Sequence, residues 1–128
     1  MEFHNPDSIG APLGAYTHGI LCAPNTQYIH ISGQVGVDAD GKVVDGIEAQ
    51  CDWAWRNITA ILKSAGMDVT NIVKMTSYLI DTADGAALRA VRGKYLGDHR
   101  PASTLLYISA LATPDLRVEI EVVAGKEV

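Results

Sequence analysis

The sequence predicts a single α+β domain of 128 residues, in which two helices cover one face of a mixed, mainly antiparallel sheet. Two stretches place apolar residues at three- and four-residue steps, which is typical of amphipathic helices. Several shorter stretches alternate apolar and polar residues, which is typical of half-buried strands. These stretches follow one another as ββ(β)αβαββ without a repeat or a linker. We therefore expect one domain over residues 1–128.

The N-terminal third predicts short strands separated by turns. A first strand is expected over residues 15–21, where β-forming and small residues mix. A second is expected over residues 27–34, where Ile29 and Ile31 alternate with polar or aromatic residues and so mark the buried face. After a glycine-containing turn, residues 43–44 predict a short third β-run that pairs back across it.

Two helices follow from the apolar periodicity. The first is expected over residues 46–65, with Asp45 as its cap and Gly66 at its end. The second is expected over residues 84–96, with capping side chains supplied by residues 81–84.

The remaining strands leave one sheet face without a helix. Residues 72–80 predict a central strand, and residues 103–108 and 117–123 predict two more. In the last strand, valine and isoleucine alternate with Glu119 and Glu121, so the glutamates point away from the helices. A sheet face that carries both apolar and charged side chains is either exposed to water or covered by other subunits. We expect a homo-oligomer whose sheets form a barrel-like core, with sites between subunits.

Composition excludes several classes of partner. Ten Lys plus Arg residues against fifteen Asp plus Glu residues give a net charge of −5, and the basic residues are scattered, so nucleic acid is not an expected partner. No apolar run is long enough to span a membrane, and residues 1–6 lack the pattern of a signal peptide. We expect a soluble, cytoplasmic protein that does not contact membranes.

The metal-ligating residue types are too dispersed for a metal site. Cys22 and Cys51 lie far apart and predict two free thiols. His18 and His30 lie on predicted strands without the close ligand spacing of a zinc cluster. We expect no bound metal.

Five segments together resemble one family. They are Gly10-Ala11-Pro12 followed by Gly14-Ala15-Tyr16, Ile31-Ser32-Gly33-Gln34, Ala65-Gly66-Met67 before Ile72-Val73-Lys74-Met75-Thr76, Pro101-Ala102, and Val118-Glu119-Ile120-Glu121. In this order the chain resembles the RidA/YjgF family, also labelled endoribonuclease L-PSP-like. The resemblance implies a chorismate-mutase-like fold, a barrel-like homotrimer, no metal or organic cofactor, and small-metabolite sites at subunit interfaces. It also implies hydrolysis of reactive enamines or imines to a carbonyl compound and ammonia.

The family's site residues carry over in part. The ring-contacting tyrosine matches Tyr16, and the contacts from the second strand match Ser32 and Gly33. The glutamate that handles the water and the leaving nitrogen matches Glu119. These four residues are the part of the family's site that the chain retains.

Three positions depart from the deaminating members. Ser103 stands where they have the arginine that binds the substrate carboxylate, Leu105 replaces a cysteine, and Arg89 replaces an asparagine. A serine hydroxyl offers one neutral hydrogen bond, whereas an arginine guanidinium offers two parallel, charge-assisted ones. The free energy of binding a simple imino acid is therefore expected to be weaker by about 2–3 kcal/mol. Arg89 on the second helix can supply the missing anchor. The alternative is that Arg89 and Arg92 are both ordinary solvated residues, and the sequence leaves open which of the two would replace the anchor. Arg100 is expected to be an exposed loop residue that could also reach the mouth of the cleft.

Two functions follow from this partial match. The first is a RidA-like hydrolase of a small reactive enamine or imine with altered substrate, with Glu119 as the catalytic residue. Its substrate-binding residues are Tyr16, Ser32, Gly33, Arg89, Ser103 and Leu105. The alternative is a non-catalytic trimer that binds a small metabolite or a partner protein.

Overall fold

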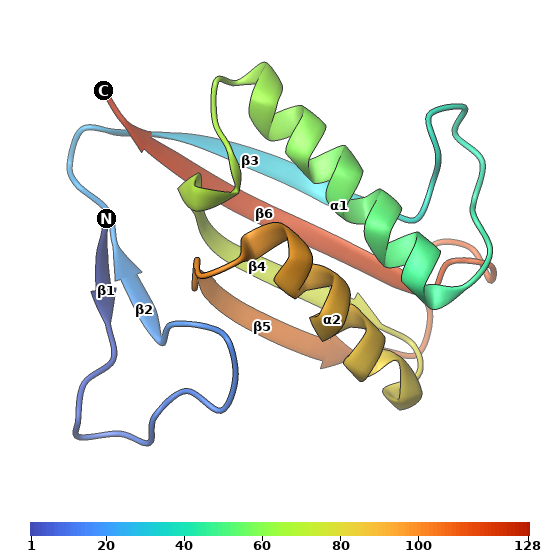
Figure 1. Ribbon diagram of the computed structural model, residues 1–128, viewed down its shortest axis with the longest axis horizontal. Helices are drawn as coiled ribbons and strands as arrows, with labels where there is room; N and C mark the ends of the chain where they lie inside the picture. The colour runs from blue at the N-terminus through green and yellow to red at the C-terminus, as the bar shows by residue number, and fades with distance from the viewer.

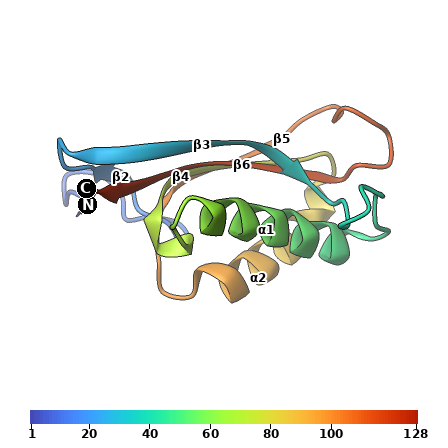
Figure 2. The same cartoon turned by 90° about the horizontal axis from the view of Figure 1, so that it is seen from above.

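The computed structural model describes residues 1–128 as two helices packed on one face of a four-stranded sheet (Figures 1 and 2). The helices are α1 (Ile47–Ser64) and α2 (Gly85–Leu96). The strands are β1 (Glu2–His4), β2 (Gly19–Leu21), β3 (Thr26–Val35), β4 (Ile72–Leu79), β5 (Ala102–Tyr107) and β6 (Val118–Glu127). Two 3-10 helices, η1 (Val69–Asn71) and η2 (Thr82–Asp84), precede β4 and α2. The sequence-based α+β prediction is confirmed.

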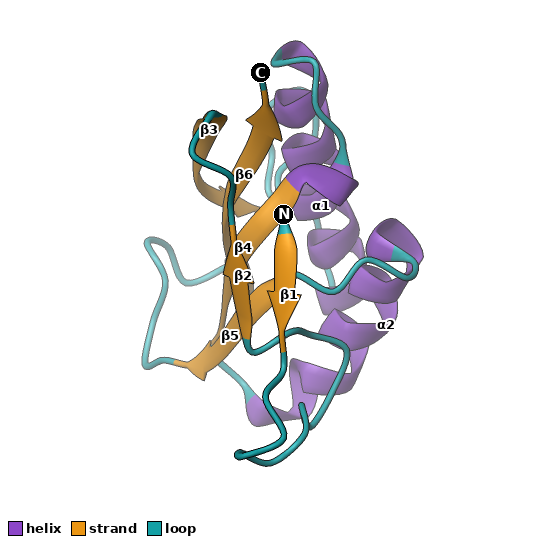
Figure 3. Cartoon of the chain, turned by 90° about the vertical axis from the view of Figure 1, so that its left-hand side faces the viewer, coloured by secondary structure: helices purple, strands orange, loops and turns teal.

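The main sheet has the strand order β3-β6-β4-β5, so β4 is central as expected. Only β4 and β5 run parallel; β6 is antiparallel to both of its neighbours. β1 and β2 form a separate two-stranded sheet. The four-stranded sheet of one chain is open, and the helices leave its second face uncovered (Figures 2 and 3). We call this second face the open face.

The core lies between the helices and the sheet. The centre of the apolar stripe of α1 is buried, with Trp55, Ile58 and Leu62 at 0% exposure. Trp55 stacks on Tyr95 of α2, with ring centroids 5.7 Å apart, and this contact joins the two helices. From β6, Ile120 points into the same core. Trp53 instead lies half-buried under the Arg56 guanidinium, because two residues along a helix face different sides.

The expected first strand over residues 15–21 was too long. Only Gly19–Leu21 pairs, with β1, which the sequence did not predict. The preceding residues belong elsewhere: Thr17 forms an isolated bridge with Ala102 at the edge of β5. The expected β-run at residues 43–44 is likewise reduced to a single bridge between Val37 and Val43.

The helix caps differ from expectation at two points. Asp45 does not cap α1; the N-cap is Gly46, whose φ of 91° suits glycine, and no side chain bonds the first turn. Gly66, with φ 67°, does follow the end of α1. Asp81 caps η2 by accepting from the Ala83 amide, whereas Asp84 makes no cap and is buried beside Arg117.

Candidate functional site

Glu119 lies on the open face because β6 alternates about a buried face. Val118 and Ile120 are fully buried under the helices, so the intervening Glu119 projects to the other side. Its cross-strand neighbour on β4 is Tyr78. This placement agrees with the alternation in the sequence.

A β-bulge in β3 brings Gly33 under the Glu119 carboxyl group. Ile31 pairs with Val122 and Gln34 with Ile120, so Ser32 and Gly33 together oppose one residue of β6. A Cβ atom at Gly33 would overlap the Glu119 carboxyl oxygen. Glycine is therefore required for this close approach, and the bulge sets where the carboxylate lies.

The two glutamates of β6 have different surroundings. Glu121 accepts a hydrogen bond of 2.6 Å from the Tyr78 hydroxyl, and this bond raises the pKa of Tyr78. The half-buried Glu119 carboxylate has no hydrogen-bond partner within the chain. Glu119 is thus the carboxylate left free to bind a proton, a water molecule or a ligand.

The loop between β5 and β6 arches over this part of the open face (Figure 2). It forms a cleft of about 310 Å³ with the sheet. We call this the Glu119 cleft; its lining residues are Tyr78, Ile108, Ala110, Leu111, Ala112, Glu119 and Glu121. The cleft is large enough for a small metabolite.

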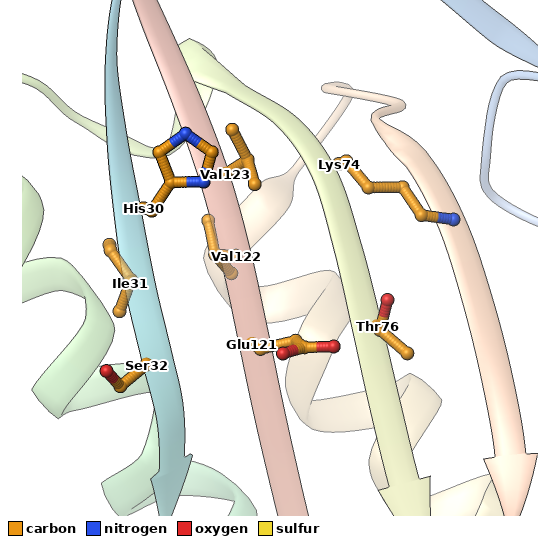
Figure 4. Close-up of a pocket in the computed structure, with 8 residues that line it drawn as sticks. All are labelled: His30, Ile31, Ser32, Lys74, Thr76, Glu121, Val122 and Val123. Atoms are coloured by element: carbon orange, nitrogen blue, oxygen red, sulfur yellow. The ribbon is translucent and has the colours of Figure 1, made fainter.

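A second hollow of about 380 Å³ lies beside it on the open face. Figure 4 shows His30 and Ser32 from β3, Glu121 from β6, and Lys74 and Thr76 from β4 around it. The Lys74 ammonium donates to the Thr104 hydroxyl at 2.6 Å. Ser32 therefore lies next to the Glu119 cleft, separated from it by Glu121, which lines both hollows.

The other expected site residues lie on the opposite face. Ser103 pairs with the buried Met75, and Leu105 pairs with the buried Ser77, so both point toward the helices. Leu105 packs against the core. One chain therefore does not bring Ser103 or Leu105 together with Glu119.

Tyr16 lies next to the β5 edge of the sheet and Arg89 lies on α2, so neither lines the Glu119 cleft. Tyr16 precedes the Thr17 bridge to β5, and its hydroxyl accepts from the Leu13 amide at 3.2 Å. Arg89 is exposed on α2, near the point where Tyr107 approaches the start of that helix. The candidate residues thus form two half-sites, one with Glu119, Gly33 and Ser32, and one along β5 and α2.

The comparisons with known proteins agree with this architecture. The family model described as Endoribonuclease L-PSP matches residues 7–126. The chain belongs to that family. A 2-iminobutanoate/2-iminopropanoate deaminase from Capra hircus is 39% identical, over 89% of this chain and 82% of the relative. A RutC family protein from Pyrococcus horikoshii is 35% identical, over 91% and 90% of the two chains.

Solved structures of Rid proteins share the fold. RidA from an Antarctic Psychrobacter species superposes with a TM-score of 0.72 at 30% identity, covering 97% of this chain and 98% of that one. A conserved Rid-family protein from Yersinia pestis gives a TM-score of 0.82 at 27% identity, covering 96% of each chain. The expected relationship to the RidA/YjgF family is confirmed.

Two parts of the candidate site were not predicted from the sequence. Tyr78 was not singled out, although alternation along β4 from the buried Met75 and Leu79 places it on the open face with the glutamates. Ile108 and the loop residues 110–112 carry no motif, and only the fold shows that they line the same cleft as Glu119. No three His, Cys, Asp or Glu side chains are placed to hold a metal ion, and no helix is long and apolar enough to cross a membrane.

Proposed function

We propose that this chain hydrolyses a small reactive enamine or imine to a carbonyl compound and ammonia, with a substrate that differs from those of the deaminating relatives. The observation that carries the proposal is the unpartnered Glu119 carboxylate, held over the Gly33 bulge at the mouth of a metabolite-sized cleft. The names of the relatives at 35–39% identity, such as 2-iminobutanoate/2-iminopropanoate deaminase, support the reaction class.

Glu119 manages the protons of this reaction. The carboxylate accepts a proton from water as the oxygen attacks the carbon of the C=N bond. The resulting acid protonates the nitrogen, which gives a carbinolamine. The carboxylate then takes the proton of the new hydroxyl group and passes it to the amino nitrogen, so that the C–N bond breaks and ammonia leaves as the carbonyl forms. Water supplies both the oxygen and the protons, so no cofactor is required. Ser32 and the backbone at Gly33 orient the planar substrate.

The active form is a homotrimer with sites between subunits. Within one chain, Glu119 is on the open face, whereas Ser103 and Leu105 are on the helix side and Tyr16 lies next to the β5 edge of the sheet. A site that contains both sets therefore needs a second copy. The open face also leaves large side chains uncovered, with Tyr28 51% and Leu106 45% exposed, which favours burial against another subunit. Light scattering that gives a stable monomer would contradict this assembly.

The altered substrate follows from Ser103. Its hydroxyl cannot grip a carboxylate as a guanidinium fork does. Arg89 on α2 is the cation we propose as replacement, since it projects from the helix beside the exposed Tyr107. A substrate bound in this way has its anionic group farther from β5 than a simple 2-imino acid held at position 103.

The test is the decay of imines generated in situ from several amino acids by an amino-acid oxidase or dehydratase. The Glu119→Gln variant should lose at least about 100-fold in rate while it keeps its fold and ligand binding. Glu127→Gln is the matched control, because it removes the same charge from an exposed position at the far end of β6. Equal rates for the wild type and Glu119→Gln would contradict the role of Glu119.

The non-catalytic trimer remains the second candidate because the carboxylate-binding position holds Ser103. The Ser103→Arg variant separates the two. If only this variant accelerates imine decay, the natural ligand is not a simple imino acid. If neither protein accelerates decay of any imine, the chain is a binding protein.

A further inference from the structure

The five arginines of the chain fall into two groups. Arg56 pairs with Asp52 at 2.8 Å, and Arg117 pairs with Asp84 at 2.7 Å. Arg89, Arg92 and Arg100 have no carboxylate partner, and all three line one cavity. The chain as a whole carries a net charge of −5, so three unpaired arginines around one cavity form a local excess of positive charge.

The cavity lies between α2, the segment that follows it, and the loop before β2. We call it the arginine pocket; its lining residues are Ala15, Arg89, Arg92, Gly93, Leu96, Gly97, His99 and Arg100. Its volume is about 80 Å³. Since one water molecule takes up about 30 Å³, the pocket has room for two or three waters, or for one carboxylate or phosphoryl group. A whole metabolite does not fit.

The guanidinium groups are placed around the pocket by the local fold. Arg89 and Arg92 are three residues apart on α2 and therefore share one side of the helix. Arg100 donates to the Gly97 carbonyl at 2.6 Å and to the His99 carbonyl at 3.2 Å, which fixes its guanidinium beside the end of that helix. Arg100 keeps further N–H groups for a ligand.

The pocket is electrostatically incomplete without an anion. Burial lowers the pKa of Arg92, and the charges of Arg89 and Arg100 lower it further. A guanidinium still stays protonated at neutral pH, so three like charges face one another there. An oxyanion among them would accept charge-assisted, bidentate hydrogen bonds and remove the repulsion.

We propose that the arginine pocket binds a single oxyanion group, a carboxylate or a phosphoryl group, at one end of a small metabolite. Arg92 is its central residue, because it is the more buried of the two helix arginines. Ala15 in the wall directly precedes Tyr16, so the rest of the ligand extends toward the Tyr16 and Ser103 half-site. That extension rests on the proposed function, whereas anion binding in the pocket does not.

The experiment titrates the full-length protein with inorganic phosphate and, separately, with malonate, at an ionic strength held constant with chloride. Arginine Nε–Hε NMR signals and calorimetry report binding. We expect saturable binding that shifts the Arg92 signal, and an affinity that falls at least about tenfold in Arg92→Gln. Arg92→Lys should also lose affinity, because an ammonium lacks the planar fork.

Lys94→Gln is the matched control. It removes one positive charge from the same helix, but Lys94 faces a different hollow that contains Glu48 and Asp52. The affinity of the Lys94→Gln variant for each anion should stay within about twofold of that of the wild type. Tighter binding of phosphate identifies a phosphoryl ligand, and tighter binding of malonate identifies a carboxylate.

Two results would overturn the proposal. One is the absence of saturation by either anion above the effect of chloride. The other is an equal loss of affinity in Arg92→Gln and Lys94→Gln, which would indicate general charge attraction. Neither anion is an imine, so a protein without imine turnover can still pass this test, and a catalytically active protein can fail it.

Discussion

The Glu119 carboxyl group occupies the space where a side chain at Gly33 would begin. The contact joins β6 to the bulge of β3, where two residues oppose one. Bulges often lie next to active sites because they redirect a side chain or open space beside it. Here the absence of a Cβ atom gives the carboxylate its position at the Glu119 cleft.

Gly33→Ala should displace the carboxylate with little loss of stability. The overlapping atoms belong to the end of a flexible side chain, so Glu119 can move away, and the free energy of unfolding should change by about 1 kcal/mol at most. A misplacement of about 1 Å can cost roughly 100-fold in rate. We therefore expect the Gly33→Ala variant to accelerate imine decay roughly 100-fold less than the wild type. Urea denaturation of the same variant measures the change in stability.

Gly10→Ala provides the control for this prediction. A Cβ atom at Gly10 would have no heavy atom within 4 Å, so rate and stability should both match the wild type. If Gly33→Ala retained the full rate, the position of the Glu119 carboxylate would not matter for turnover.

Gln50 ties α1 to the segment that leads into β6. Its amide nitrogen donates to the carbonyls of Val44 at 3.0 Å and Asp115 at 2.8 Å, and its oxygen accepts from the Arg117 amide at 2.8 Å. The side chain is buried, with 1% exposure. Gln50→Leu keeps the approximate size but leaves three backbone groups without their partner.

We therefore expect Gln50→Leu to lower the free energy of unfolding by about 3 kcal/mol, measured by urea denaturation. Because Arg117 lies two residues before Glu119, the variant should also lose part of its turnover. Gln27→Leu, at an exposed position on β3, should change stability by less than about 0.5 kcal/mol. Equal stability of the two variants would rule out an anchoring role for Gln50.

The Asp84–Arg117 ion pair is a second anchor of the same segment. The Asp84 side chain is only 5% exposed, and its second oxygen has no hydrogen-bond partner. Arg117→Met leaves this buried charge unpaired and should cost about 3 kcal/mol. Asp84→Asn combined with Arg117→Met should cost less than the sum of the single changes. A double-mutant cycle with no coupling energy would show that the pair contributes nothing.

Periodicity predicted the helices and the main strands, and it predicted the sheet face on which Glu119 lies. The alternation of apolar and charged residues along β6 shows directly which side of that strand is buried. It could not relate Ser103 to Glu119. Their opposite orientation depends on the parallel register of β4 and β5, which is a long-range pairing. The shortened first strand has a similar cause, since Thr17 pairs with Ala102 far along the chain rather than with its neighbour in sequence.

The arginine pocket shows the same limit. Arg89 and Arg92 are recognisable as one side of a helix, but Arg100 joins them only because the chain turns back after α2. At the start of α1, a local rule favoured Asp45 as the cap, while the chain turns through Gly46 at positive φ. Local patterns therefore predict elements and faces, whereas the half-sites arise from tertiary pairing.

Cys51 makes stability depend on pH in the alkaline range. Burial raises the pKa of its thiol to about 12, and the nearby charge of Asp84 adds to the effect. The unfolded chain releases this proton near pH 9, whereas the folded chain keeps it until about pH 12. Within this window the unfolded state binds fewer protons, so the free energy of unfolding falls as pH rises, by at most about 1.4 kcal/mol per pH unit.

Urea denaturation of the wild type and Cys51→Ala at several pH values isolates this contribution. The two proteins differ in no other titratable group, so the difference between the two curves reports the thiol. The stability advantage of the wild type should shrink steadily above pH 9 and stay constant below it, because both states are protonated there. A difference that stays constant up to pH 11 would mean that Cys51 ionises equally in both states.

In the native protein, Cys22 should be the thiol that reacts with a disulfide reagent, since Cys51 is fully buried.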